Sequence, residues 1–446
     1  MSLPTSPRRL ARPGVRLAAV TVAAALALAA CAGSDSGADP TSATDAADEE
    51  VTIRFSWWGS DSRHALTQQV IDAFEAKHPN ITVEPDFTTW DGYWDKLSTS
   101  IAGGDAPDVI TQEERYLREY GTRGVLLDLG EVEDTLDTSG IDPSVAESGS
   151  FDGATYGVAT GVNAYVVLAD PQAFADAGVE MPDDTTWTWD DYVEIATKIS
   201  EASGGAVFGT QDYGFNEPAF SIYARQHGQS LYKEDGSLGY KDSLMADWWK
   251  ISLALQQSGG QPEASRSVEI DGAGPEGSLL GTNTGAMGVW WTNQLGAISK
   301  ASGRELQILR FPGESESKRT GMYFKPAMYY SIAKTSKHPE EAALFVDFLL
   351  NSTEAGQLLL SDRGLPANLE VRTAVTPNFS DADKQSAEFL EGLREDIVDG
   401  VAVPPVGAGE VVPLIKRING EVLFGQITPE DAAAKFTAEV TAATQK

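Results

Sequence analysis

The chain of 446 residues carries 33 lysines and arginines against 66 aspartates and glutamates, a formal net charge of −33 at pH 7. Such an acid excess repels phosphate backbones and anionic lipid, which argues against nucleic acid as a partner. The chain is too long for one hydrophobic core and suits two or three. Its single cysteine rules out a disulfide within the chain.

The N-terminus has the composition of an export signal. Residues 1–30 begin with a basic segment and continue with an uncharged run, 17–30, that is shorter than the about 20 residues of a spanning helix. Cys31 follows the small residues Ala29 and Ala30, and this arrangement resembles the bacterial lipobox, in which the sulfur is acylated before cleavage. An ordinary signal peptide or a buried core cysteine are the alternatives. We therefore expect a mature protein that begins at Cys31, carries palmitate or a similar acyl chain, and is anchored to the cell membrane on its extracytoplasmic side.

The segment after the cysteine lacks the large apolar residues that a hydrophobic core requires. Residues 31–50 contain small, polar and acidic types and no large apolar residue. Such a composition predicts a flexible linker with a reach of about 25 Å.

Ordered structure is predicted from residue 51. Residues 51–56 alternate apolar and polar side chains, as a strand does, and Leu66, Val70 and Phe74 mark the buried face of a following helix. A second strand at 81–85, a second helix with Tyr93 and Leu97, and a third strand at 108–110 continue the alternation. This order predicts a parallel α/β sheet.

Helical patterns return in the second half of the chain. They lie at 190–203, 243–257, 339–350, about 410–423 and 429–441. No internal repeat is found at any fixed period.

The sequence contains one nucleotide-binding pattern and four histidines, and neither has the chemistry of a binding site. Residues 272–277 satisfy GxGxxG, but Pro275 removes one N–H donor and Glu276 and Asp271 repel phosphate. The four histidines lack metal-ligand spacing. We expect no cofactor and no metal.

Carboxylates and tryptophans are the remaining candidates for function. Asp108, Glu113 and Glu114 lie at the end of a predicted strand, where a pair of acids could serve a glycoside hydrolase, although a polar binding rim is favoured. Most tryptophans stand beside glycine, aspartate or threonine in apparent loops, where aromatic faces suit stacking on sugars. Trp248 and Trp249 lie in a helix interior and are assigned to the core.

Several stretches taken in order resemble the family 1 extracellular solute-binding proteins, the sugar receptors of ABC importers that include maltose-binding protein. The pieces are the lipobox and the segments 74–83, 104–110, 116–129, 156–158, 187–192, 285–287, 333–340 and 364–366. One departure is Val167-Leu-Ala-Asp170, where many members have Tyr-Tyr-Asn-Lys.

The resemblance implies a two-lobed periplasmic-binding-protein fold of type II, with α/β lobes joined by hinge crossings and the ligand in the cleft. Lobe 1 would comprise residues 51–162 and 322–362, and lobe 2 residues 163–321 and 363–446. The crossings would fall near 162–168, 319–325 and 362–366.

The resemblance also implies which side chains meet the ligand. The residues carried over by position are Trp58, Asp61, Gln112, Glu113, Glu114, Asn163, Tyr223, Trp291, Asn293, Tyr329 and Asn368.

The function implied is that of a lipid-anchored, monomeric receptor that binds a carbohydrate, such as an oligosaccharide, without chemistry and delivers it to the permease subunits of an ABC importer. The alternatives are a surface-tethered glycoside hydrolase or lyase, and a receptor for another small solute such as a polyamine, which the acidic stretches also suit.

Overall fold

The computed structural model describes residues 50–59 and 61–445. The predicted signal peptide 1–30, the acyl-bearing Cys31 and nearly all of the linker 31–50 lie outside the described residues. Among the described helices, none is long and apolar enough to cross a bilayer.

The first lobe is built on a five-stranded sheet in the order β2-β1-β3-β15-β6. Its strands are β1 (Val51–Trp58), β2 (Ile81–Thr88), β3 (Val109–Gln112), β6 (Val158–Ala159) and β15 (Tyr329–Ile332). Strands β1 to β3 pair in parallel, which confirms the α/β prediction, whereas β15 pairs antiparallel with β3 and β6. The helices of this lobe are α1 (Asp61–Lys77), α2 (Trp90–Ala102), α3 (Glu114–Thr122), α4 (Pro143–Ala146), α11 (Pro339–Asn351), α12 (Thr353–Leu359) and α13 (Leu369–Val375). The lobe also carries the short hairpin of β4 (Ser150–Phe151) and β5 (Ala154–Thr155).

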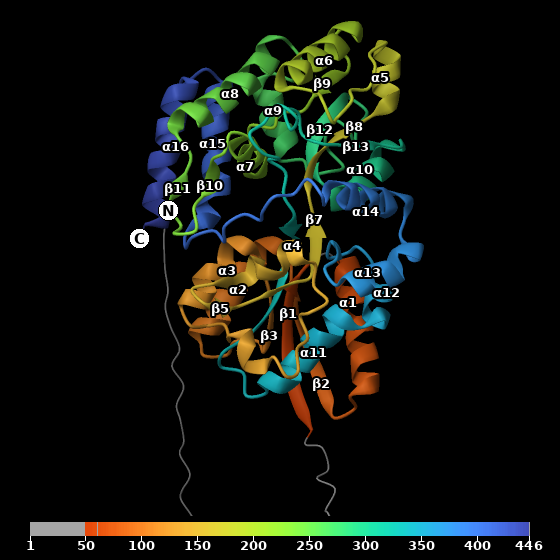
Figure 1. The fold of residues 1–446 in the computed structure, drawn as a ribbon, viewed down its shortest axis with the longest axis vertical. Helices are drawn as coiled ribbons and strands as arrows, with labels where there is room; N and C mark the ends of the chain where they lie inside the picture. Colours follow the sequence, from red (N-terminus) through yellow and green to blue (C-terminus); the bar gives the residue numbers. More distant parts are fainter. Residues whose placement is uncertain (1–49, 60, 446) are drawn as a thin grey trace, which may run out of the picture. The chain divides into compact units, whose positions relative to one another are not determined.

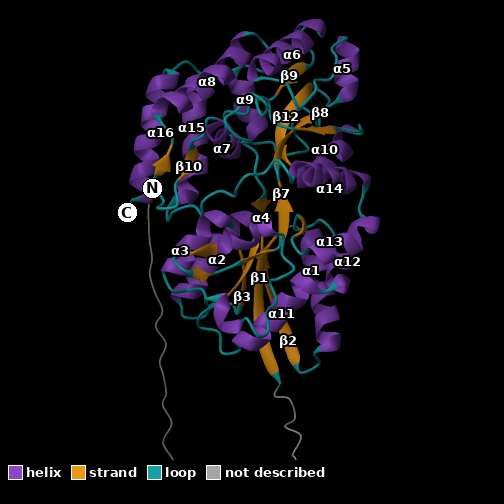
Figure 2. Cartoon of the chain, viewed as in Figure 1, coloured by secondary structure: helices purple, strands orange, loops and turns teal. Residues whose placement is uncertain are grey.

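The second lobe has a four-stranded sheet in the order β13-β8-β12-β9. These strands are β8 (Tyr165–Ala169), β9 (Phe208–Thr210), β12 (Gly285–Trp291) and β13 (Gln307–Leu309), with a separate hairpin of β10 (Ser230–Tyr232) and β11 (Leu238–Gly239). Its helices are α5 (Pro171–Ala177), α6 (Trp189–Ala202), α7 (Glu217–Gln226), α8 (Asp242–Gln257), α9 (Ala264–Asp271), α10 (Leu295–Ser302), α14 (Asp381–Leu393), α15 (Val411–Leu423) and α16 (Pro429–Thr444). Figure 2 shows helices around the strands of each lobe.

Three short antiparallel strands connect the lobes. They are β7 (Gly161–Asn163), β14 (Lys325–Pro326) and β16 (Leu365–Pro366), with β7 in the centre. β7 lies between the two larger sheets (Figure 1). Each strand overlaps a segment in which we expect a crossing, and β7 and β14 each extend one residue beyond it.

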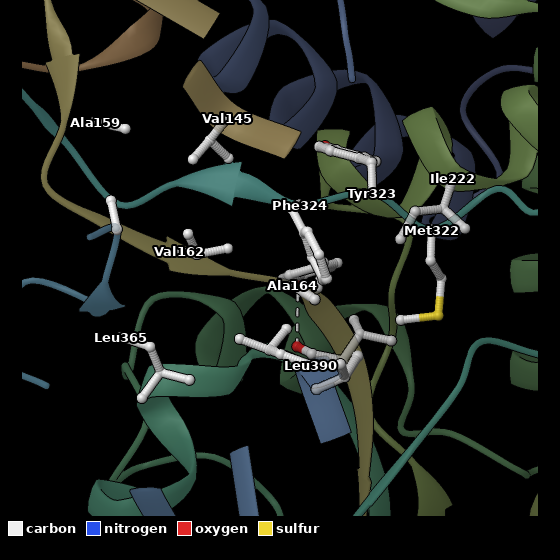
Figure 3. Packing of buried hydrophobic residues seen from close by; sticks show 14 of the residues in the cluster. Val145, Ala159, Val162, Ala164, Ile222, Met322, Tyr323, Phe324, Leu365 and Leu390 are labelled. Atoms are coloured by element: carbon white, nitrogen blue, oxygen red, sulfur yellow. Dashed lines mark hydrogen bonds between the residues drawn. The ribbon is translucent and has the colours of Figure 1, made fainter. Parts of the chain in front are cut away.

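Apolar side chains from all three crossing segments pack together with both lobes. Val162, Phe324 and Leu365 belong to one buried cluster that also contains Val145 of α4 and Leu390 of α14 (Figure 3). The hinge is therefore part of a hydrophobic core that continues into both lobes.

The last crossing differs from the prediction. We expected residues 363–446 in lobe 2, but α13 packs against α12 of lobe 1, where Val371 covers Gly356. The chain therefore returns to lobe 1 after β16 and crosses to lobe 2 only between α13 and α14. The sequence conceals this return because an amphipathic helix does not reveal which lobe it covers.

We predict that Gly161→Ala damages the hinge. A Cβ at Gly161 would lie 2.1 Å from the carbonyl oxygen of Arg363, a backbone atom that cannot move aside cheaply. The expected loss is about 1–3 kcal/mol of unfolding free energy, measured by urea denaturation. Gly392→Ala is the matched control, because a Cβ there meets open space near the end of α14, and it should be neutral or slightly stabilising. Equal stability of the two variants would contradict this account of the hinge.

Candidate functional site

A cavity of about 1240 Å³ lies between the lobes. Lobe 1 contributes residues of α3, α4 and the β4–β5 hairpin, and lobe 2 contributes residues of α7 and β10. The segment 397–404, which connects α14 to the C-terminal helices, forms a further part of the wall. In Figure 1, α3 and α4 belong to the lower lobe and α7 and β10 to the upper lobe. A volume of this size suits a small-molecule ligand larger than a monosaccharide.

Helix α7 turns one face toward this cavity. Glu217, Ser221 and Arg225 line it at a spacing of four residues, which places them on one side of a helix. Tyr223, which we predicted as a ligand contact, lies roughly 200° around the helix from Ser221. Its ring packs against Trp189 and His227 inside lobe 2. The structure therefore does not bring Tyr223 to the cavity. The four-residue spacing of Glu217, Ser221 and Arg225 is the sequence pattern that could have identified the cavity-facing residues of α7.

The carboxylates at the start of α3 are already paired with cations. Glu113 caps the helix by accepting from the Arg115 N–H at 2.9 Å, and its carboxylate also accepts from the Arg115 guanidinium at 2.9–3.1 Å. Lys325 of β14 donates to Glu113 at 3.3 Å and lies 3.2 Å from Glu114. Burial opposes ionisation of Glu113, but Arg115 and Lys325 overcome it and lower its pKa to about 2. Burial and the neighbouring Glu113 raise the pKa of Glu114 despite the nearby Lys325.

Glu217 is a carboxylate of the cleft that has no ion-pair partner among the described residues. It stands in the first turn of α7, and burial, with the charges of Glu114 and Glu113, raises its pKa to about 7 against the opposing effect of Arg115 and Lys325. Lobe 2 thus places a carboxyl group with a pKa near neutrality close to the ion pairs of lobe 1.

Two further predicted residues lie beside Lys325, whose sequence neighbour Pro326 and ion-pair partner Glu114 line the cavity; we call Lys325, Asn163 and Trp291 the floor of the cleft. Asn163 is opposite Lys325 in the hinge sheet, so their side chains share one face, and its Oδ1 accepts from Thr292 at 3.4 Å. Trp291 ends β12, and its ring centroid lies 5.4 Å from the Lys325 ammonium. The structure therefore gathers Glu113, Glu114, Asn163 and Trp291 around a lysine that the sequence analysis did not single out.

Gln112 and Tyr329 occupy neighbouring strands of lobe 1. They are paired in register, and Tyr329 lines the cavity while its hydroxyl donates to the Ser148 carbonyl at 3.2 Å. Gln112 is fully buried, and both polar atoms of its amide lack a hydrogen-bond partner. A buried amide without hydrogen bonds, here at the end of β3 next to Glu113, lowers the free energy of unfolding. A hydrogen bond from a ligand or a water molecule would remove this destabilisation.

Of the predicted residues, Glu114 and Tyr329 line the cavity itself, and the four that remain to be placed do not. Trp58 packs in a lobe 1 cluster with Tyr93, Trp90 and Trp94. Asp61 is exposed at the start of α1 and Asn293 is exposed after β12. Asn368 caps α13, accepting from the N–H groups of Glu370 and Val371 and donating to Asn351, so its side chain serves the fold.

Half of the tryptophans are buried, and none of them lines the cavity. Trp248 and Trp249 are fully buried, as predicted. Trp57 and Trp187, which appeared to stand in loops, are also buried, whereas Trp90 remains 40% exposed. Neighbouring small or polar residues therefore do not suffice to place a tryptophan at a ligand site.

Comparison with known proteins assigns the family. Residues 59–356 match the bacterial extracellular solute-binding proteins, and the chain belongs to this family. The chain is 26% identical to the diacetylchitobiose binding protein of Streptomyces coelicolor, over 90% of this chain and 88% of that one. It is 28% identical to the lactose-binding protein of Rhizobium radiobacter, over 81% and 84% of the two chains.

The solved structures agree with the fold. A family 1 extracellular solute-binding protein from Alicyclobacillus acidocaldarius is 30% identical, with a TM-score of 0.71 over 89% of this chain and 99% of that one. The two-lobed periplasmic-binding-protein fold is thereby confirmed.

The described residues contain no group of three or more histidine, cysteine or acidic side chains placed to hold a metal ion. The residues that line the cavity offer carboxylates, guanidinium and ammonium groups, hydroxyls and aromatic faces.

We predict that Glu217 makes stability and charge depend on pH near neutrality. Its folded pKa of about 7 exceeds the ordinary 4.5, so the folded state holds a proton that the unfolded state has lost, and stability falls as pH rises from about 4.5 to 7. Glu217→Gln should remove this part of the pH dependence in urea unfolding series. Glu147→Gln on the same cavity wall serves as the control variant. A Glu217 carboxyl that titrates near 4.5 by NMR would contradict the expectation.

Proposed function

We propose that this chain is an extracytoplasmic, lipid-anchored, monomeric receptor that binds a carbohydrate and delivers it to the permease of an ABC importer. The observation that carries the proposal is the cavity of about 1240 Å³ between two lobes that are joined by three short strands. A hinge of this kind allows closure over a ligand, and closure is how two-lobed receptors bury their solute.

The lining of the cavity supports a polyhydroxylated ligand. Rings of Tyr232, Tyr323 and Tyr329 offer faces for the C–H surfaces of a sugar, and Glu217 and Ser221 offer acceptors and a donor for its hydroxyls. The relatives from Streptomyces coelicolor and Rhizobium radiobacter are named for diacetylchitobiose and lactose, two disaccharides, which also favours a saccharide ligand.

We assign ligand contacts on both sides of the cleft. Glu114, Tyr329 and the unsatisfied Gln112 would act from lobe 1, with Asn163 and Trp291 at the floor, as the family resemblance predicted. Glu217 and Ser221 would take the place that we first assigned to Tyr223. Trp58, Asp61 and Asn293 would contact only a ligand that extends beyond the cavity.

The state of the acids favours binding over hydrolysis. Asp108 accepts from the Arg54 N–H and from the Ser336 hydroxyl, away from the cavity, and Glu113 is held by Arg115 and Lys325. A glycoside hydrolase needs a free pair of carboxyl groups on either side of a glycosidic bond. Incubation of the pure protein with oligosaccharides should return them intact, and cleavage products would favour the enzyme.

We predict that saccharides change the intrinsic tryptophan fluorescence of the mature domain, because Trp291 lies at the floor of the cleft. A panel of neutral mono- and oligosaccharides titrated into the protein should give saturable binding to at least one member. Trp291→Ala should weaken that binding by about tenfold or more, as expected for the loss of a stacking contact and its buried area. A response to polyamine, peptide or metal ions with none to any saccharide would refute the proposal.

We predict that Cys31→Ser releases the receptor from the membrane without changing its affinity for saccharide. The acyl chain would be attached through a linker that is separate in sequence from the cleft. Fractionation of cells followed by titration of the released protein measures both properties. A weaker affinity in the released variant would show that the linker is part of the binding domain.

A further inference from the structure

The floor of the cleft contains a lysine whose ammonium group meets both lobes. Lys325 is the first residue of the hinge strand β14, and its Nζ lies 3.3 Å from Glu113 Oε1 and 3.2 Å from Glu114 Oε1 in lobe 1. The same ammonium lies 5.4 Å from the ring centroid of Trp291 in lobe 2. A hinge strand, a pair of acids and an indole ring therefore converge on one cation.

These charges are largely withdrawn from solvent and they balance. The side chains of Lys325, Glu113 and Glu114 are 11%, 5% and 11% exposed. Arg115 supplies the second cation through its bidentate contact with Glu113. With both acids ionised, two negative charges face two positive charges, and without Lys325 one buried carboxylate would lack a counterion.

The surroundings of the Lys325 ammonium are those of an amine-binding site. Two carboxylates and an aromatic face are the groups that proteins use to bind organic ammonium ions. Here the site is filled by a side chain of the protein itself, which approaches from the hinge.

We propose that Lys325 is a specificity-determining residue, which occupies an amine-binding site at the floor of the cleft and thereby directs the cleft toward neutral ligands. The neutral ligand is the carbohydrate of the proposed function, and to that extent the inference rests on it. The amine-binding site does not rest on it, because the three contacts define the site without reference to any ligand. A protonated amine entering the native cleft would meet an ammonium group where it requires a carboxylate.

Two features make Lys325 suited to this role. Its backbone pairs with Asn163 in the central hinge strand, so the side chain starts from a fixed position. Its acidic partners are the N-cap and first residue of α3, where the helix dipole also favours negative charge. The remaining acid nearby, Glu217, comes from lobe 2 and would reinforce an amine site once Lys325 was removed.

The test is Lys325→Ala studied with n-propylammonium, which replaces the deleted three carbons and the nitrogen. Isothermal titration calorimetry should show that the variant binds propylammonium and putrescine at least about tenfold more tightly than the wild type. The neutral isostere 1-propanol should not bind to either protein. The neutral saccharide that the wild type binds most tightly should bind the variant about tenfold more weakly, and propylammonium should restore part of that loss.

Matched variants separate the charge from the fold. Lys325→Arg keeps the positive charge and should gain no affinity for amines. Glu114→Gln combined with Lys325→Ala removes the acid that would hold the amine, restores the charge balance and should abolish amine binding. Lys337→Met replaces an exposed lysine and should behave as wild type. If Lys325→Ala does not fold, Lys325→Met, which keeps the stem and vacates only the position of the nitrogen, replaces it in a comparison that uses the ammonium ion as the amine.

Equal amine affinities in the wild type and in Lys325→Ala, or in Lys325→Met where it replaces Lys325→Ala, would overturn the inference, as would an unchanged saccharide affinity in that variant. The absence of saccharide binding in the wild type would instead overturn the proposed function, and the amine comparison would still decide the role of Lys325.

Discussion

The hinge sheet is the constraint on which the rest of the structure depends. Each of its strands is only two or three residues long, and yet these strands position both halves of the binding site. Gly161 permits them to lie close together, because any side chain there would collide with the backbone of the neighbouring crossing. From this sheet Asn163 and Lys325 extend to the same face, toward the acids of α3 and the end of β12. The floor of the cleft is thus attached to the one element that both lobes share.

The net negative charge of the chain does not extend to the charged groups of the cleft, where cations are paired with acids. The sequence has an excess of 33 negative charges, which made a polyamine ligand an alternative. In the structure, aromatic rings of the cleft and hinge make cation–π contacts with arginine and lysine side chains. These contacts are Arg118 over Phe151, Arg225 over Tyr323, Arg394 over Phe324 and Lys325 over Trp291. Each of these cations also pairs with an acid, so the walls combine aromatic faces with locally neutral polar groups. This local neutrality suits a ligand that has hydroxyls and no charge.

Much of the fold could be predicted from the sequence, whereas much of the site could not. Alternating strands and helices over 51–112 were visible because each buries one periodic face, and the predicted helix at 243–257 agrees with α8 within a residue. The course of α13 was not visible, because its amphipathic pattern suits either lobe. The partners of Glu113 explain the failure in the site. Arg115 is two residues away and could have been noticed, but Lys325 is distant in sequence and is brought near only by the hinge. Tyr223 shows the opposite error, since a residue carried over by position was placed on the wrong side of its helix.

The ion pairs at the floor of the cleft should remain intact when the lobes separate, whereas an ion pair that joins the two lobes should break. Glu113 and Glu114 lie in lobe 1 beside the hinge strand that carries Lys325, so rotation of lobe 2 would break the contact with Trp291 and leave these ion pairs intact. Asp142 of lobe 1 is different, because it accepts hydrogen bonds from Arg394, at the end of α14 in lobe 2, at 2.9 Å. Burial raises the pKa of Asp142, but this and neighbouring donors overcome that effect and lower the pKa to about 2. Opening at this edge would uncover a buried carboxylate that still retains Arg372 of its own lobe. The neutral floor therefore persists in an open form, and a ligand that enters it meets a preorganised set of acceptors and needs only the closing of lobe 2 to bring Glu217 and Trp291 against it.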